Sequence, residues 1–167
     1  FLLTVTIFLQ ERFRLVYHCQ IMITNMLKKV LLVDDDSVTL SLCDMVIKRF
    51  TFAEEVDKAQ NGQEAIDYFN EIVQDSTKPK SDVPSVIFLD LNMPVMNGWD
   101  FLDEFIRKGF NKLFPDTRII VLSSSIDPRD IQRASNYDII IEFISKPLTL
   151  KVIKEIKQHS VLVPHFS

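Results

Sequence analysis

Four short runs of mainly aliphatic residues, each followed by polar side chains, constrain the fold of this chain more than any other feature. The runs are 30–33, 85–89, 118–122 and 139–144. Unbroken apolar runs of this length are typical of strands that are buried on both faces of a parallel sheet. A weaker run at 54–59 predicts one more strand between the first two. The sequence therefore favours a sheet of five strands.

Segments with helical spacing of apolar side chains alternate with these runs. The expected helices cover approximately 40–50, 65–73, 99–106, 127–134 and 150–158. Strands that alternate with helices predict an α/β domain, a doubly wound parallel sheet in three layers with helices on both faces. Ligand sites in such sheets lie just beyond the carboxyl ends of the strands. Functional side chains are therefore expected among the residues that follow each strand.

Composition excludes several classes of protein. The chain has 167 residues with a net charge of −4, and 47% of them are hydrophobic. These values fit one globular domain and argue against disorder. An acidic chain lacks the basic face that non-specific nucleic-acid binding requires, so we expect no direct contact with nucleic acid. The two cysteines, Cys19 and Cys43, form no CxxC pair, which argues against a zinc site or a disulfide framework. We expect a cytoplasmic protein.

The ends of the chain differ from its centre. Residues 1–25 begin without Met, and their apolar stretch at 1–9 is too short to span a bilayer and lacks the flanks of a signal peptide. We expect this extension to be non-native or poorly ordered, although a strand-forming arm or a membrane-surface segment is also compatible with it. Residues 26–158 are expected to form the domain, and 159–167 a C-terminal tail.

The polar residues that end the strands form one constellation. Asp34 and Asp35 follow the first apolar run, Asp90 the second, Ser123 the third and Lys146 the fourth. Because parallel strands end at the same edge, three carboxylates, a hydroxyl and an ammonium should converge there. Clustered carboxylates repel each other unless they bind protons or a cation, and Mg²⁺ prefers oxygen ligands of this kind. A carboxylate beside Mg²⁺ and a lysine can attack a phosphoryl donor.

Each of these residues also has a simpler interpretation. An Asp after a strand is most often a helix cap or a turn residue, and Asp36 fits that role. A Lys before Pro is usually a solvated loop residue. Only the joint pattern, in order along the chain, favours a functional site.

The phrases that carry this pattern resemble the receiver domain of two-component response regulators. In chain order they are VLLVDDDSVTL, NGQEAI, VIFLDLNMPVMNGWDFL, IIVLSSS and FISKPL. The resemblance covers residues 28–158. It implies the flavodoxin-like receiver fold, in which the five parallel strands lie in the order 2-1-3-4-5.

The resemblance also implies a role for each matched position. Asp90 corresponds to the phosphoacceptor. Mg²⁺ would be bound by Asp35 and Asp90, with Asp34 acting largely through water, and by the backbone carbonyl of Asn92. Lys146 would pair with the phosphoryl group, and the bond between Lys146 and Pro147 would be cis.

The resemblance further implies a conformational switch. The hydroxyl of Ser123 would move toward the phosphoryl group, and the aromatic ring of Phe143 would follow into the vacated space. Thr is commoner than Ser at the first position, and Phe143 replaces the more usual Tyr. Residues 76–84 and 109–117 are long for the loops of the family and are expected to lie away from the site.

Three functions compete. The leading hypothesis is a stand-alone receiver that takes a phosphoryl group from a sensor histidine kinase or a histidine phosphotransfer protein. The receiver would then bind a downstream protein target. A homodimer is possible, and no role at a membrane is expected. The second is a Mg²⁺-dependent phosphohydrolase, but such enzymes commonly carry an acidic group where this chain has Asn92. The third is a binding module that is never phosphorylated. We expect no enzyme beyond weak autophosphorylation and autodephosphorylation.

Overall fold

The computed structural model describes residues 26–75, 82–124 and 127–166. Its strands are β1 (Leu27–Val33), β2 (Ala53–Ala59), β3 (Val86–Leu89), β4 (Arg118–Ser123) and β5 (Ile140–Ser145). The α-helices are α2 (Ser37–Arg49), α3 (Gly62–Gln74), α4 (Gly98–Arg107), α5 (Phe110–Leu113), α6 (Pro128–Ala134) and α7 (Leu150–Lys157), and a 3₁₀ turn, η2, covers Val163–His165. The expected N-terminal extension, 1–25, lies outside the described residues.

The five strands form one parallel sheet in the order β2-β1-β3-β4-β5. Leu32 of β1 pairs with Phe88 of β3, and Phe88 pairs in turn with Ile120 of β4. This register aligns the carboxyl ends of the three central strands. The expected fold class and strand order are therefore confirmed, including the order that rested on the resemblance.

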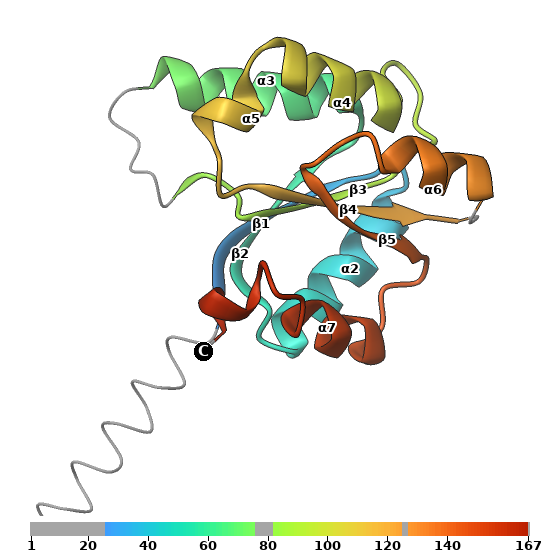
Figure 1. The fold of residues 1–167 in the computed structure, drawn as a ribbon. Helices are drawn as coiled ribbons and strands as arrows, with labels where there is room; N and C mark the ends of the chain where they lie inside the picture. Colours follow the sequence, from blue (N-terminus) through green and yellow to red (C-terminus); the bar gives the residue numbers. More distant parts are fainter. Residues whose placement is uncertain (1–25, 76–81, 125–126, 167) are drawn as a thin grey trace, which may run out of the picture.

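Helices cover both faces of the sheet (Figure 1). Helices α3, α4 and α5 lie on one side, and α2 and α7 lie on the other. Each face has its own apolar core: β1, β3 and β4 send alternate side chains to the α2 and α7 side, such as Leu32 and Phe88, and to the α3 and α4 side, such as Leu31 and Ile87. Burial on both faces explains why these strands are unbroken apolar runs in the sequence.

Polar side chains set the start of the main helices. The carboxylate of Asp36 accepts hydrogen bonds from the backbone N–H groups of Val38 and Thr39, so Asp36 is the N-cap of α2. Asn61 and Asn97 cap α3 and α4 in the same way. The NG pairs of the sequence, which predict turns, therefore mark helix starts that follow a turn.

Two regions contain more structure than the sequence predicts. The segment 109–117, expected as a loop, contains the short helix α5, whose Phe110 is buried beside the ring of Phe69. In the C-terminal tail, Leu162 is 1% exposed, and the ring of Phe166 lies 5.3 Å from that of Phe52. The tail thus adds to the core on the α2 and α7 side. Of the loop expected at 76–84, residues 76–81 lie outside the described residues.

Within the described residues, none of the helices is long and apolar enough to cross a membrane.

Candidate functional site

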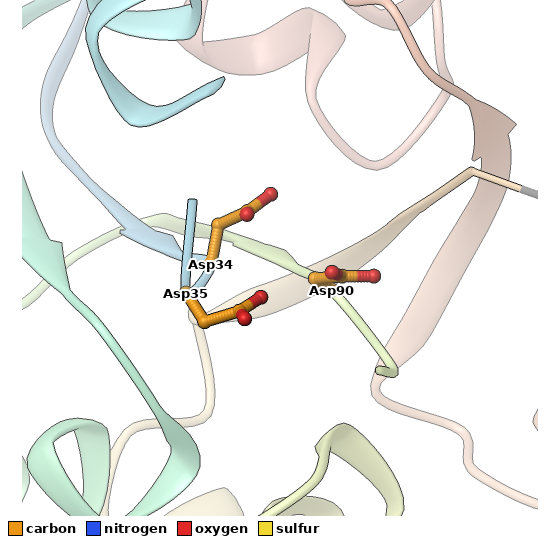
Figure 2. Close-up of side chains that lie close together, drawn as sticks. All are labelled: Asp34, Asp35 and Asp90. Atoms are coloured by element: carbon orange, nitrogen blue, oxygen red, sulfur yellow. The ribbon is translucent and has the colours of Figure 1, made fainter. Parts of the chain in front are cut away.

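The carboxyl ends of four strands bring the predicted site residues to one edge of the sheet. Asp34 and Asp35 follow β1, Asp90 follows β3, Ser123 ends β4 and Lys146 follows β5. Figure 2 shows the three aspartate side chains projecting from neighbouring strand ends. The parallel register produces this convergence, because the carboxyl ends of paired parallel strands lie side by side, however far apart the strands are in the sequence.

The three aspartates form a compact acidic group. One carboxylate oxygen from each of Asp34, Asp35 and Asp90 lies within 4.8 Å of the others. Asp34 and Asp90 are buried, at 4% and 6% exposed, whereas Asp35 is exposed. Three hard oxygen donors, one of them open to solvent, suit a Mg²⁺ ion that keeps part of its water shell. The donor set therefore fits the expected metal.

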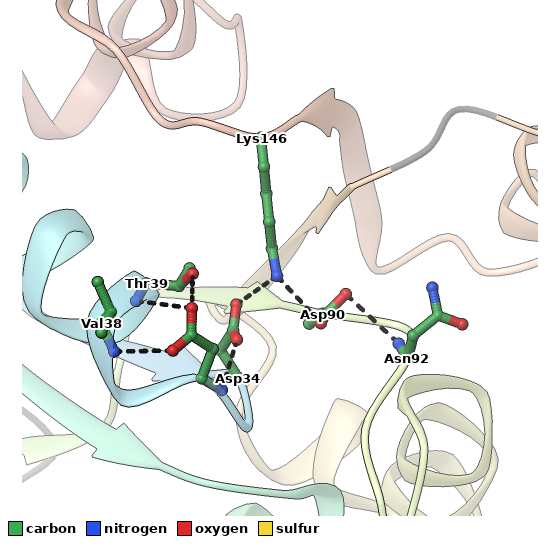
Figure 3. A network of polar contacts seen from close by, with 7 residues as sticks. Asp34, Val38, Thr39, Asp90, Asn92 and Lys146 are labelled. Carbon is green, nitrogen blue, oxygen red and sulfur yellow. Dashed lines mark hydrogen bonds and ion pairs between the residues drawn. The ribbon is translucent and has the colours of Figure 1, made fainter.

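Lys146 supplies the positive charge at this site. Its Nζ lies 2.6 Å from Oδ2 of Asp34 and 3.0 Å from Oδ2 of Asp90 (Figure 3). Burial alone lowers the pKa of Lys146, but its hydrogen bonds to Asp34 and Asp90 outweigh that effect, and the net pKa is raised. The ammonium group therefore stays charged between the two buried carboxylates.

Both carboxylate oxygens of Asp34 have a partner within the site. Its Oδ1 accepts a hydrogen bond from the backbone N–H of Asp36, at 3.0 Å, while its Oδ2 contacts Lys146. Burial raises the pKa of Asp34, and the contacts with Lys146 and Asp36 oppose that rise only in part. A buried carboxylate of this kind gains from a nearby cation, which favours its ionised form.

Asn92 meets the site through its backbone. Its side chain is exposed, and its backbone N–H donates a hydrogen bond of 3.4 Å to Oδ1 of Asp90 (Figure 3). The two oxygens of Asp90 are thus oriented by different partners, Asn92 and Lys146. The predicted use of the Asn92 carbonyl as a metal ligand stays a prediction.

The two predicted switch residues lie on adjacent strands. Ser123 is 1% exposed, and its backbone carbonyl accepts a hydrogen bond of 2.8 Å from the backbone N–H of Lys146. Phe143 is half-buried in β5 and pairs in register with Val121, two residues before Ser123. The Lys146–Pro147 bond is cis, as the resemblance implied. The switching roles of Ser123 and Phe143 stay predictions.

A glycine fixes the path of the loop after Asp90. Gly98 donates its backbone N–H to the carbonyl of Leu91, and a Cβ at Gly98 would lie 2.4 Å from the backbone oxygen of Asp90. Only glycine allows this approach, so Gly98 sets the path of the chain that carries the acceptor carboxylate. The NG signal at 97–98 locates the turn but does not reveal this contact.

Cys43 lies beneath the acidic group and takes no part in its chemistry. It is 5% exposed, and burial raises the pKa of its thiol to about 11. The thiol is neutral at pH 7 and is not a nucleophile or a metal ligand in this state.

Comparison with known proteins agrees with the fold. Residues 30–158 match the response regulator receiver domain family. A solved two-component response regulator from Cytophaga hutchinsonii is 32% identical, with a TM-score of 0.72, and the match covers 83% of this chain and 99% of that chain.

Two curated relatives show the range of proteins that contain this domain. The chemotaxis protein CheY of Thermotoga maritima is 30% identical over 97 residues, which are 58% of this chain and 68% of that protein. Hybrid signal transduction histidine kinase L of Dictyostelium discoideum is 28% identical over 133 residues, which are 80% of this chain but 7% of that protein. From the sequence match, the strand order and the acidic strand ends together, we conclude that this chain belongs to the response regulator receiver domain family.

Proposed function

We propose that the protein is a phosphoacceptor switch in which Asp90 takes a phosphoryl group from a phosphohistidine. The donor would be a sensor histidine kinase or a histidine phosphotransfer protein. The observation that carries this proposal is the position of Asp90. One of its carboxylate oxygens lies 3.0 Å from Nζ of Lys146, and the carboxylates of Asp34 and Asp35 lie beside it. A histidine kinase among the relatives supports this class of donor.

The transfer step needs a carboxylate and neutralisation of charge. A carboxylate oxygen of Asp90 attacks the phosphorus of the donor, a P–O bond forms and the P–N bond to the imidazole breaks. The electron pair of the P–N bond stays on that ring nitrogen, and a proton already carried by the other ring nitrogen of the donor makes the leaving imidazole neutral. Negative charge collects on the transferred phosphoryl oxygens, and the Lys146 ammonium is placed to stabilise it. The hydroxyl of Ser123, a buried residue at the end of the next strand, would bind a phosphoryl oxygen.

Mg²⁺ is part of this proposal. Asp34, Asp35 and Asp90, with the backbone carbonyl of Asn92, would hold the ion, which when bound would neutralise charge between the carboxylates and the phosphoryl oxygens. The chain itself contributes the orientation of Asp90 and the buried partner Asp34. Exposure of Asp35 leaves that side of the site open to a donor.

The output of the switch would be binding to a protein. Movement of Ser123 and Phe143 would alter the surface formed by β5, α6 and α7, which would then bind a downstream target or a second copy of the chain. A groove of about 410 Å³ beside β5, lined by Phe143, Ile144 and Val152 among others, belongs to this surface. We propose a cytoplasmic site of action and no direct contact with nucleic acid.

A switch explains the site better than a hydrolytic enzyme does. Asn92, two residues after Asp90, cannot act as a general acid or base, so a phosphorylated Asp90 would lose its phosphoryl group slowly. Only weak autophosphorylation and autodephosphorylation are expected. A binding module that is never phosphorylated would not need the complete set of three aspartates, Ser123 and Lys146 at one edge of the sheet.

The proposal is tested by intact-mass measurement after incubation with acetyl phosphate and Mg²⁺. The full chain should gain one phosphoryl group, and the Asp90→Asn variant none. The matched control is Asp100→Asn, at an exposed carboxylate of α4, which should be labelled like the wild type. Chelation of Mg²⁺ should abolish labelling. Labelling of Asp90→Asn would refute the assignment of the acceptor. Absence of labelling in the wild type, repeated with a phosphorylated histidine kinase as donor, would overturn the proposed function.

A further inference from the structure

A cluster of four side chains, which lies apart from the acidic group, connects α4 with α6 and with the turn that follows α6. Trp99 and Asp103 belong to α4, Arg133 belongs to α6, and Tyr137 follows α6. The guanidinium of Arg133 lies 4.4 Å from the ring centroid of Trp99 and 3.6 Å from Oδ2 of Asp103. The hydroxyl of Tyr137 donates a hydrogen bond of 2.6 Å to Oδ1 of Asp103. We call these four residues the α4–α6 clamp.

Helix α6 has little apolar attachment to the rest of the protein. Ala134 is its one buried residue, and its largest aliphatic side chain, Ile131, is 45% exposed. Helix α4, by contrast, buries Phe101, Leu102 and Phe105 in the core. The α4–α6 clamp therefore ties a weakly buried helix to a firmly buried one. Cation–π and charge-assisted contacts can hold such a helix in place, although each of them is weak alone.

The position of α6 in the chain connects the α4–α6 clamp to the acidic site. Ser123 ends β4, and α6 is the next helix in the chain. At its other end, the backbone of Ile139 is anchored to β4 through a hydrogen bond of 2.9 Å from Ile119. Only residues 124–127 separate Ser123 from Pro128, the first residue of α6, so a shift of Ser123 toward Asp90 would move the start of this short connection, while the α4–α6 clamp holds the carboxyl-terminal end of α6.

We infer that the α4–α6 clamp stabilises the resting position of α6 and thereby sets how readily the Asp90 site responds to a phosphoryl group. This inference rests on the proposed function. If α6 moves when the site is filled, the free energy that the α4–α6 clamp gives to the resting position is subtracted from binding at Asp90. Loosening the α4–α6 clamp should then strengthen binding of a phosphoryl mimic, without any change to a residue of the site.

Asp103 is the best position for a test, because one carboxylate serves both Arg133 and Tyr137. Asp103→Ala removes both contacts, and Arg133→Gln removes the ion pair and the contact with Trp99. The control is Gln132→Ala, at an exposed position of the same helix. Trp99 is the only tryptophan of the chain and belongs to the α4–α6 clamp, so tryptophan fluorescence reports on the surroundings of one clamp residue.

The first measurement needs no phosphodonor. Amide hydrogen exchange in residues 128–137 of the full chain should be faster in Asp103→Ala and Arg133→Gln than in the wild type and in Gln132→Ala. The emission of Trp99 should change in the two α4–α6 clamp variants and stay constant in the control. Equal exchange in all four proteins would overturn the inference whatever happens at Asp90.

The second measurement titrates beryllofluoride, a phosphoryl mimic, with Mg²⁺ in excess, by calorimetry. The half-saturating concentration should fall by about three- to tenfold in each α4–α6 clamp variant. The double variant should show less than the product of the two effects, because both changes break one unit. If the affinity for beryllofluoride stayed unchanged in variants whose amide hydrogen exchange is faster, the proposed coupling between the α4–α6 clamp and Asp90 would be overturned. No binding to the wild type would instead count against the proposed function, and the coupling would fail with it.

Discussion

The ammonium of Lys146 lies 2.6 Å from a carboxylate oxygen of Asp34, which is closer than its 3.0 Å approach to Asp90. The resemblance assigns Lys146 to the phosphoryl group, but in this structure it neutralises two buried carboxylates at once. Lys146 thus supplies part of the charge compensation that a metal ion would supply. Removing its charge should therefore affect the stability of the fold as well as signalling.

Lys146→Ala should destabilise the protein in the absence of divalent cations. Two carboxylates that are 4% and 6% exposed would lose their shared partner. The loss should be about 2–4 kcal/mol in the free energy of unfolding, measured by urea denaturation. Saturating Mg²⁺ should recover part of it, and Mg²⁺ should bind at least as tightly as to the wild type. Lys151→Ala, at a side chain that is 85% exposed, is the matched control. Equal loss in both variants would show that the position of Lys146 is unimportant.

Gly98→Ala should damage the fold and the acceptor site together. The added Cβ would lie 2.4 Å from the backbone oxygen of Asp90 and 2.8 Å from Cα of Leu91, so the backbone of the loop must shift. We expect a loss of about 1–3 kcal/mol in stability and slower labelling by acetyl phosphate. The comparison variant is Gly109→Asn, because a Cβ there meets no atom within 4 Å and Asn tolerates its positive φ. Wild-type labelling of Gly98→Ala would contradict the role given to this contact.

The sequence alone predicted the parallel sheet and the convergence of Asp34, Asp90 and Lys146. Buried strands are continuous apolar runs, and parallel pairing brings the residues that follow them to one edge. The order of the strands does not follow from periodicity, because either edge of a strand can accept a neighbour. That part needed the family resemblance.

Contacts that depend on the exact path of the chain could not be predicted. Helix α5 occupies only Phe110–Leu113, a length too short for helical periodicity to register. The α4–α6 clamp joins Asp103 to Tyr137 across 34 residues, and no local pattern marks such a pair. The contact between Lys146 and Asp34 is of the same kind, since the distance from the lysine to each carboxylate depends on the exact path of the chain after β5.

The pH dependence of stability should report the ion pairs of Asp44. The carboxylate of this α2 residue lies 2.8 Å from Nζ of Lys58 in β2 and 2.9 Å from Nζ of Lys48. Burial alone would raise the pKa of Asp44, but the hydrogen bonds from Lys58 and Lys48 outweigh it and lower the pKa below its ordinary value of 3.8. The folded protein therefore binds fewer protons than the unfolded chain just below that value.

The sign of this effect fixes the expected result. A lowered pKa in the folded state adds stability above the pKa of the unfolded chain, and this stability is lost as the pH falls through the folded value. The coupling energy between Asp44→Asn and Lys58→Gln, from a double-mutant cycle of urea unfolding, should be constant from about pH 7 to pH 5 and shrink below about pH 4. A coupling that stays undiminished as the pH falls below about 4 would show that the pair is not held by the charge of Asp44.

Leu162→Ala should show that the C-terminal tail is part of the core. Leu162 is 1% exposed and packs in the same cluster as Phe52 and Ile156, and the chain there is fixed further by Lys157, whose Nζ donates to the backbone carbonyls of Phe50 and Thr51. Truncating a buried leucine costs about 2–5 kcal/mol, since it removes apolar burial and leaves a cavity. Val163→Ala, at a side chain that is 41% exposed, should cost less than about 1 kcal/mol. Thermal or urea unfolding of the two variants makes the comparison, and equal, small losses would mean that the tail contributes nothing to stability.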